Sequence, residues 1–120
     1  MGRLKEELLQ RVENFADRIL RVAEALDSRK VSRRILDQIV AAGTSVGANV
    51  FEADEAMSRP DFVKTLSVAA KELAETRFWL RLVARNGWLD SELLRPLLLE
   101  VDELRRVLGT IITKSKPTGT

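Results

Sequence analysis

Apolar residues recur at steps of three and four through most of this 120-residue chain, and no segment shows the two-residue alternation of a strand. Such spacing keeps one side of a helix toward a core. The pattern predicts four amphipathic helices, at about residues 4–26, 32–52, 58–86 and 90–112, with short polar connections. This order favours an all-α, antiparallel up-down four-helix bundle over residues 1–113. Residues 114–120 are expected to form a disordered tail.

Several residues mark the expected helix ends. Ser58 is a good N-cap for the third helix, where Pro60 is tolerated in the first turn. Gly87 is a natural C-terminal stop for that helix, and Asp90 or Ser91 can cap the next one. Pro96 is a candidate kink in the fourth helix, because its ring clashes with the preceding turn.

The third and fourth helices carry more apolar residues than one core-facing stripe explains. In the fourth helix, the expected core stripe consists of Leu93, Leu97, Leu104, Leu108 and Ile111, and other apolar residues widen it. A helix that is apolar around much of its circumference is usually buried on more than one side, which favours a homo-oligomer. The alternative is that these side chains face water, as single apolar residues often do. The predicted oligomer interface consists of Phe78, Trp79, Leu82, Leu94 and Leu98.

The second helix contains two glycines, Gly43 and Gly47, beside a polar line. A glycine in a helix interior costs about 1 kcal/mol relative to alanine, so close approach of a neighbouring helix is expected to compensate. The polar line is read as a structural network, paired with Arg77 or Arg81 of the third helix or with Glu75, because an unpaired buried charge is very costly. A ligand or acid–base site around Asn49 and Glu52 is the minor alternative. The predicted network consists of Ser45, Asn49, Glu52 and Glu75.

The residue types that are missing limit the chemistry. The chain has no Cys, no His and no Tyr, which excludes disulfides, thiol nucleophiles, Ser-His triads and ordinary zinc sites. We therefore expect no catalytic residue, no metal site and no cofactor, and we do not expect an enzyme. No apolar run approaches the ~20 residues that span a bilayer, and the first residues lack a secretory signal. A cytoplasmic location without a membrane partner is the expectation.

Two basic groups stand out, although the net charge is only +2. The densest cluster lies at the connection between the first two helices, and a second group follows the third helix at intervals of four residues. Each group is either a solvated, salt-bridged face or a phosphate-binding surface that an assembly would multiply. Aromatic residues suited to base stacking are sparse, so base-specific recognition is not expected. The candidate nucleic-acid-binding residues are Arg29, Lys30, Arg33, Arg34, Arg77, Arg81 and Arg85.

Two spaced signatures resemble a known family. The first is Gln38-Ile39-x-x-Ala42-x-x-Ser45-Val46-x-x-Asn49-Val50-x-Glu52 in the second helix. The second, in the third helix, is Ser58-Arg59-x-Asp61-Phe62 followed by Ala69 and Leu73-x-Glu75-Thr76-Arg77-Phe78-Trp79-Leu80-Arg81-Leu82. Over about residues 8–112 the chain resembles the bacterial four-helix bundle proteins, also called 23S rRNA intervening-sequence or S23-type proteins. A related branch contains the accessory variability determinant of diversity-generating retroelements.

The resemblance implies a left-turning up-down bundle that assembles into a homopentamer, often with a central channel. Members of the retroelement branch bind nucleic acid and a reverse transcriptase through a basic surface, and most members have no known biochemical role. This chain departs from the family at Ala53, where Gly is usual, and at Lys71 and Glu72, where many members have Gly-Ser. Its near-neutral charge weakens the case for nucleic-acid binding.

The first hypothesis is therefore a non-enzymatic homo-oligomeric bundle protein, with a pentamer favoured and its own copies as partners. The second hypothesis, from a different class, is an accessory factor that binds RNA or DNA and is associated with rRNA or a retroelement. No small-molecule substrate is inferred.

Overall fold

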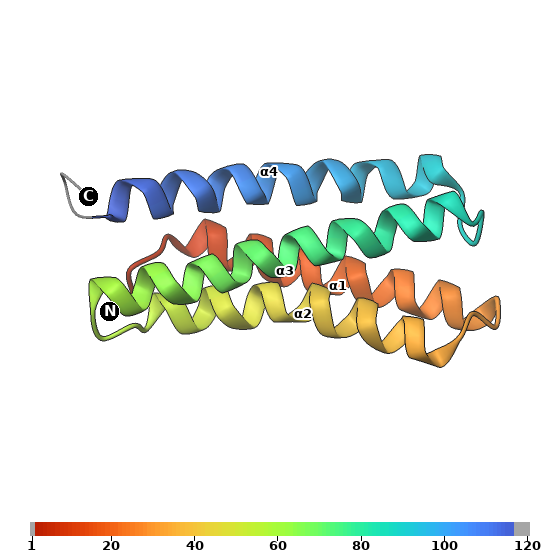
Figure 1. Ribbon diagram of the computed structural model, residues 1–120, viewed down its shortest axis with the longest axis horizontal. Helices are drawn as coiled ribbons and strands as arrows, with labels where there is room; N and C mark the ends of the chain where they lie inside the picture. The colour runs from red at the N-terminus through yellow and green to blue at the C-terminus, as the bar shows by residue number, and fades with distance from the viewer. Residues whose placement is uncertain (1, 117–120) are drawn as a thin grey trace.

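The computed structural model describes residues 2–116 as four long helices, α1 (Glu6–Ser28), α2 (Arg33–Asp54), α3 (Arg59–Arg85) and α4 (Ser91–Ser115). Consecutive helices run in opposite directions along one axis (Figure 1), within an envelope of 48 × 24 × 24 Å. The prediction of an all-α four-helix bundle is confirmed. Because α4 continues to Ser115, the first residues of the predicted tail are helical. Residues 117–120 of that tail lie outside the described part of the chain.

The predicted helix signals act largely as expected. The Ser58 hydroxyl accepts a hydrogen bond from the amide three residues later at 3.2 Å, and Asp90 Oδ1 accepts one from the amide two residues later at 2.9 Å. Gly87 follows α3 with φ +67°, a conformation that glycine adopts without steric cost. Pro96 does not interrupt α4, which is one continuous helix from Ser91 to Ser115.

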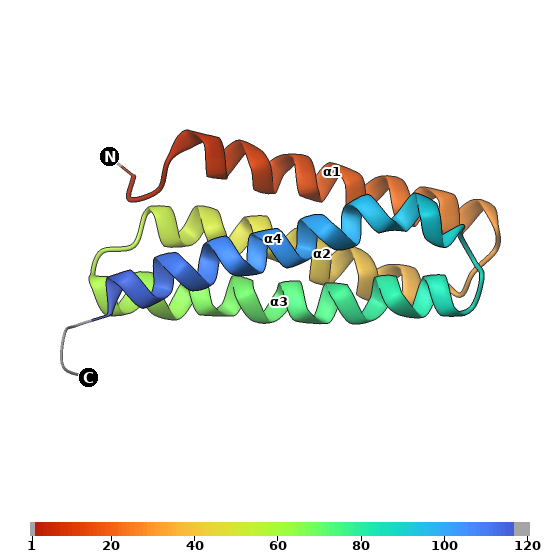
Figure 2. The ribbon, with the colours of Figure 1, turned by 90° about the horizontal axis from the view of Figure 1, so that it is seen from above.

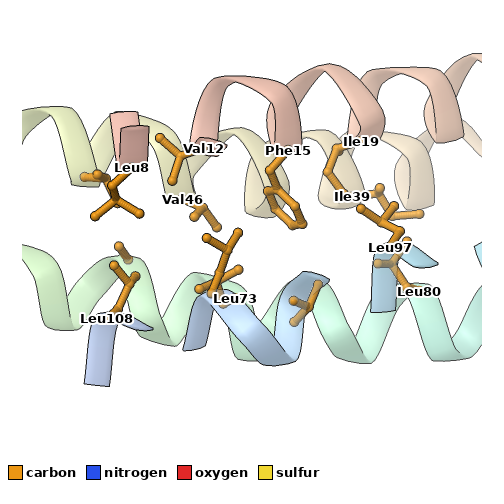
Figure 3. Close-up of a cluster of buried hydrophobic side chains, with 14 of the residues drawn as sticks. Leu8, Val12, Phe15, Ile19, Ile39, Val46, Leu73, Leu80, Leu97 and Leu108 are labelled. Atoms are coloured by element: carbon orange, nitrogen blue, oxygen red, sulfur yellow. The ribbon is translucent and has the colours of Figure 1, made fainter. Parts of the chain in front are cut away.

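One core runs the length of the bundle, and side chains from all four helices meet in it (Figure 3). The inward series of α4 differs from the expected one, because Leu93 is 74% exposed whereas Leu94 is only 2% exposed. The prediction that Leu93 faces the core is therefore wrong. A step of three or of four residues back from Leu97 fits helical spacing equally well, and the tertiary packing selects Leu94. The core residues of α4 are Leu94, Leu97, Val101, Leu104 and Leu108.

The two glycines of α2 face α1. A Cβ at position 43 would lie 2.6 Å from both γ carbons of Ile19, a side chain that is completely buried. A Cβ at position 47 would make an ordinary contact, 3.6 Å from the carbonyl oxygen of Val12. The α1–α2 contact therefore requires glycine at position 43, whereas a small side chain would fit at position 47.

The helices do not close into an evenly packed ring. α1 packs on α2, α2 on α3 and α3 on α4, and of the four neighbouring pairs α1 and α4 are the most loosely packed. Figure 2 shows α4 crossing the bundle obliquely, so that its C-terminal end lies away from the N-terminal end of α1. Arg11 and Glu100 bridge the two helices through paired hydrogen bonds of 2.7 Å and 2.8 Å.

The residues that precede α1 are tied to the end of α2. The Asp54 carboxylate, only 9% exposed as a residue, accepts a hydrogen bond from the Leu4 amide at 2.6 Å. The Arg3 amide donates to the Asp54 carbonyl at 3.1 Å, and Arg3 Nε donates to the Ala56 carbonyl at 3.0 Å. Asp54 thus places a negative charge beside the N-terminus of α1, where the helix dipole favours it.

Candidate interaction surface on α3

The C-terminal half of α3 brings two of the predicted residue sets together on one surface. Successive residues of a helix are about 100° apart, so burial of Leu80 turns Phe78 and Leu82 toward the outside. Phe78 is 57% exposed, and Leu82 is partly exposed. We name Phe78 and Leu82 the apolar ridge. It forms a hollow of about 540 Å³ together with Ala74, Arg77, Arg81 and Arg85.

An aromatic pair extends the apolar ridge toward α2. The rings of Phe78 and Trp79 meet edge to face, with centroids 5.1 Å apart and planes inclined by 70°. The Trp79 indole N–H donates to Glu75 Oε2 at 3.2 Å, and its ring packs partly against the core. Glu75 therefore orients Trp79 on the surface.

The three arginines of this surface differ in their partners. Arg77 Nε lies 3.2 Å from Asp102 Oδ1 of α4, so its charge is matched within the chain. Neither Arg81 nor Arg85 forms a salt bridge within residues 2–116, and both side chains are exposed. The hollow therefore combines a hydrophobic ridge with two cations that are free to pair with an external acid.

The second basic group lies at the turn between α1 and α2, at the same end of the bundle as the α3–α4 turn (Figures 1 and 2). Arg33 pairs with Asp27 at 3.2 Å. Lys30 has φ 62°, which turns the chain between the two helices. Its exposed members, Arg29, Lys30, Arg33 and Arg34, form a basic end to the bundle.

The four residues of the predicted polar network do not form one buried cluster in this chain. Asn49 Nδ2 donates to the Ser45 carbonyl at 2.8 Å within α2. Glu52 and Glu75 are exposed, and Glu75 holds Trp79 as described. The expected pairing of this line with arginines of α3 is not present among the described residues, because Arg77 turns to α4 instead.

The acidic group that faces Ser45 is Glu72, which the sequence reasoning did not select. Partial burial raises the pKa of Glu72, and the neighbouring Glu75 carboxylate raises it further, while a hydrogen bond from Ser45 acts in the opposite direction. Glu72 lies one helical turn before Thr76, which is buried, so it is near the inward side of α3. This spacing is the sequence signal that could have identified it. Asp54 was missed as well, because its partner is fifty residues away in the sequence.

The α4 residues of the predicted oligomer interface are less accessible than expected. Leu94 belongs to the core of the single chain, and Leu98 is partly buried against it, so Leu94 is not available to a neighbour. The leucines that α4 exposes are Leu93 and Leu99, at 74% and 62%. Phe78, Trp79 and Leu82 are the members of the predicted interface that share one accessible surface.

Within residues 2–116, no three or more acidic residues come together in a group that could hold a metal ion. In the same part of the chain, no helix is both long and apolar enough to cross a membrane.

Comparison with known proteins places these features in a family. The sequence model of the 23S rRNA-intervening sequence proteins matches residues 5–110. The fold is similar to the crystal structure of a protein with unknown function from the S23 ribosomal protein family of Bacteroides thetaiotaomicron VPI-5482. The TM-score is 0.83 at 34% sequence identity, over 87% of this chain and 96% of that one. No curated protein matches this chain at a significant level.

Proposed function

This chain belongs to the family of 23S rRNA-intervening sequence proteins, and we propose that it functions as a non-enzymatic homo-oligomer, a pentamer, joined through the α3 surface. The proposal treats the bundle as a structural subunit whose activity is to bind other copies of itself. The description of the family, which names 23S rRNA, supports a cytoplasmic location for it.

The observation that carries this proposal is the apolar ridge beside Trp79. A Phe that is 57% exposed, a Leu next to it and a partly buried Trp form a contiguous apolar surface. Arg81 and Arg85 flank this surface. Aromatic residues and arginine are the residue types that protein interfaces enrich and that contribute most to their affinity. Burial of such a surface against a partner is favourable and roughly proportional to the apolar area removed from water.

A closed ring also constrains what the ridge can meet. In a five-fold ring each contact is heterologous, so the ridge of one subunit meets a different surface of the next. The chain offers a second set of exposed apolar residues on α4, Leu93 and Leu99. We propose Leu99, which lies beside Leu98 in a hollow between α3 and α4, as part of the complementary surface.

The proposal is tested by the mass of the native protein in solution. Light scattering after size exclusion, at micromolar concentration, should give five times the 13.5 kDa subunit mass. Phe78→Glu and Leu82→Glu should each lower the mass, because either change removes an apolar side chain from the contact and places a charged group there. Met57→Glu is the matched control, since Met57 is 94% exposed in the α2–α3 connection. A wild-type mass of one subunit would overturn the proposal.

Nucleic-acid binding is the second candidate function. Its specific support is that Arg81 and Arg85 lie beside the exposed ring of Phe78 and form no salt bridge within residues 2–116. Each phosphate that an arginine neutralises releases counterions, so binding to generic RNA should weaken steeply with salt. Arg81→Glu with Arg85→Glu should reduce the affinity for a mixed-sequence RNA and flatten its salt dependence. No binding of RNA or DNA at low salt would remove this candidate.

A further inference from the structure

A second hollow lies on the other side of the bundle, along the seam between α1 and α4. Its volume is about 580 Å³, within the usual range of about 300–1,000 Å³ for small-molecule sites. Apolar side chains from both sides line it, Leu4 and Leu8 from the N-terminal side and Val107 and Ile111 from α4. We call this hollow the seam groove. Leu4, Val107 and Ile111 are only partly buried, so the groove exposes apolar surface that no described residue covers.

The seam groove follows from the way the helices cross. α4 diverges from α1 toward its C-terminal end (Figure 2), and the backbones of the two helices make few close approaches. The paired hydrogen bonds between Arg11 and Glu100 hold α4 to α1 one helical turn beyond Leu8. Before α1, the hydrogen bonds of Arg3 to the end of α2 hold the preceding segment in place. The groove is therefore bounded by fixed groups at both ends.

The charges at the groove are mainly positive. Arg3, Lys5 and Arg11 line it together with a single acid, Glu7. Glu100 already neutralises the charge of Arg11. Arg3 donates one hydrogen bond to the Ala56 carbonyl, and its guanidinium lies 5.7 Å from the centre of the Phe62 ring. Lys5 is exposed and forms no salt bridge within residues 2–116. A free cation thus lies at the N-terminal end of an apolar channel.

From this arrangement we propose that the seam groove binds a single-chain amphipathic anion, a free medium-chain fatty acid. Its carboxylate would pair with Lys5 and the remaining nitrogens of Arg3, and its chain would lie between Leu8 and Val107. The wall from Lys5 to Arg11 is about 9 Å long at 1.5 Å per residue, which suits an extended chain of about eight carbons.

The proposal predicts a specific dependence on chain length. Each methylene moved from water into the groove should strengthen binding about fourfold, so octanoate should bind about 15-fold more tightly than hexanoate. The affinity should then level off for longer chains, because the bridge between Arg11 and Glu100 ends the groove. Decanol, which has the chain without the charge, should bind at least about tenfold more weakly than decanoate.

Titration of the full chain with sodium decanoate, followed by calorimetry, is the test. Lys5→Glu should weaken binding at least about tenfold. Lys64→Glu is the matched control, an exposed lysine on α3 away from the groove, and should leave binding unchanged. Val107→Trp should abolish binding by filling the groove, and Thr110→Trp is its control, at an exposed position of α4 that does not line the groove. Lys5→Glu changes no buried group, so its result stands even if the Val107 variant unfolds.

Three outcomes would overturn the proposal. The first is the absence of saturable decanoate binding by the wild-type protein. The second is binding that Lys5→Glu and Val107→Trp leave intact. The third is a change in the native mass of Val107→Trp without any decanoate binding, which would assign the groove to a second copy of the chain. The first two results do not bear on Phe78 or Leu82, so the proposed assembly through α3 stands or fails separately from them.

Discussion

Replacement of Gly43 by alanine should destabilise the bundle, although alanine is the better helix former. The new methyl group would lie 2.6 Å from both γ carbons of Ile19 and 3.0 Å from its Cβ. Ile19 is β-branched and completely buried, so no change of rotamer moves both γ carbons away. The backbones of α1 and α2 must therefore separate to admit the methyl group.

The expected magnitude follows from two opposing terms. Alanine gains about 1 kcal/mol over glycine in a helix interior. Overpacking of a filled core costs about 1–3 kcal/mol, and two contacts at 2.6 Å belong near the upper end. The net loss should be about 1–2 kcal/mol, which for a domain of this size lowers Tm by roughly 4–8 °C.

The matched variants are the other two glycines in helix interiors. At Gly47 the nearest atom to a new Cβ is 3.6 Å away, and at Gly109 nothing lies within 4 Å. Both alanine variants should therefore gain up to about 1 kcal/mol from helix propensity. Urea unfolding followed by circular dichroism measures all three, at one fixed protein concentration because assembly would add to the stability. Stabilisation of the Gly43→Ala variant to the same degree as the other two would refute the reasoning.

A double-mutant cycle isolates the contact itself. Ile19→Ala alone should cost about 2–5 kcal/mol, since it leaves a cavity in the core. In the Gly43→Ala background the same change should cost clearly less, because it removes the two carbons that the new methyl group meets. Equal costs in the two backgrounds would show that Ile19 is not what excludes a side chain at position 43.

Three further predictions use groups outside this contact. Arg11→Ala should cost about 1 kcal/mol in urea unfolding, less at high salt, because its paired hydrogen bonds to Glu100 are only partly buried. A loss that salt does not reduce would contradict this. Asp54→Ala should cost about 1–2 kcal/mol and speed amide exchange at Leu4, which loses its acceptor; unchanged exchange would contradict it. Burial raises the pKa of Glu72 in the folded protein, so the folded state binds a proton more readily than the unfolded state. The free energy of unfolding should therefore rise as the pH falls from above this pKa to the ordinary carboxyl pKa. Glu72→Gln should be more stable than wild type at pH 7 and lack this rise, and an unaltered pH profile would contradict the assignment.

The helices and most of their ends could be predicted from local patterns. Ser58 and Gly87 act through groups within a few residues of themselves, so the sequence contains both partners of each interaction. The need for glycine at position 43 was expected too, although its neighbour is the side chain of Ile19 and not a backbone. Such local signals were sufficient for the bundle.

The errors arose where two local choices were equivalent. Leu93 and Leu94 both continue the spacing of α4, and only the path of the α3–α4 turn distinguishes them. Arg77 pairs with Asp102 of α4 and not with the polar line on α2. This choice depends on the rotation of α3 about its own axis, which local spacing does not determine. The seam groove could not be predicted at all, because it depends on the crossing of α1 and α4.

The α3 surface cannot serve both proposed functions at once. If the apolar ridge of Phe78 and Leu82 is covered by a neighbouring subunit, Arg81 and Arg85 lie at the edge of that contact, where they would pair with acids of the neighbour. Nucleic acid would then be left with the basic end at the α1–α2 turn, which a ring repeats once per subunit. Charge reversal at Arg81 should in that case change the native mass, while reversal at Arg29 should change RNA affinity alone. If Arg81→Glu lowers RNA affinity and leaves the mass unchanged, the ridge is not the contact between subunits, and the arginines of α3 are the nucleic-acid surface.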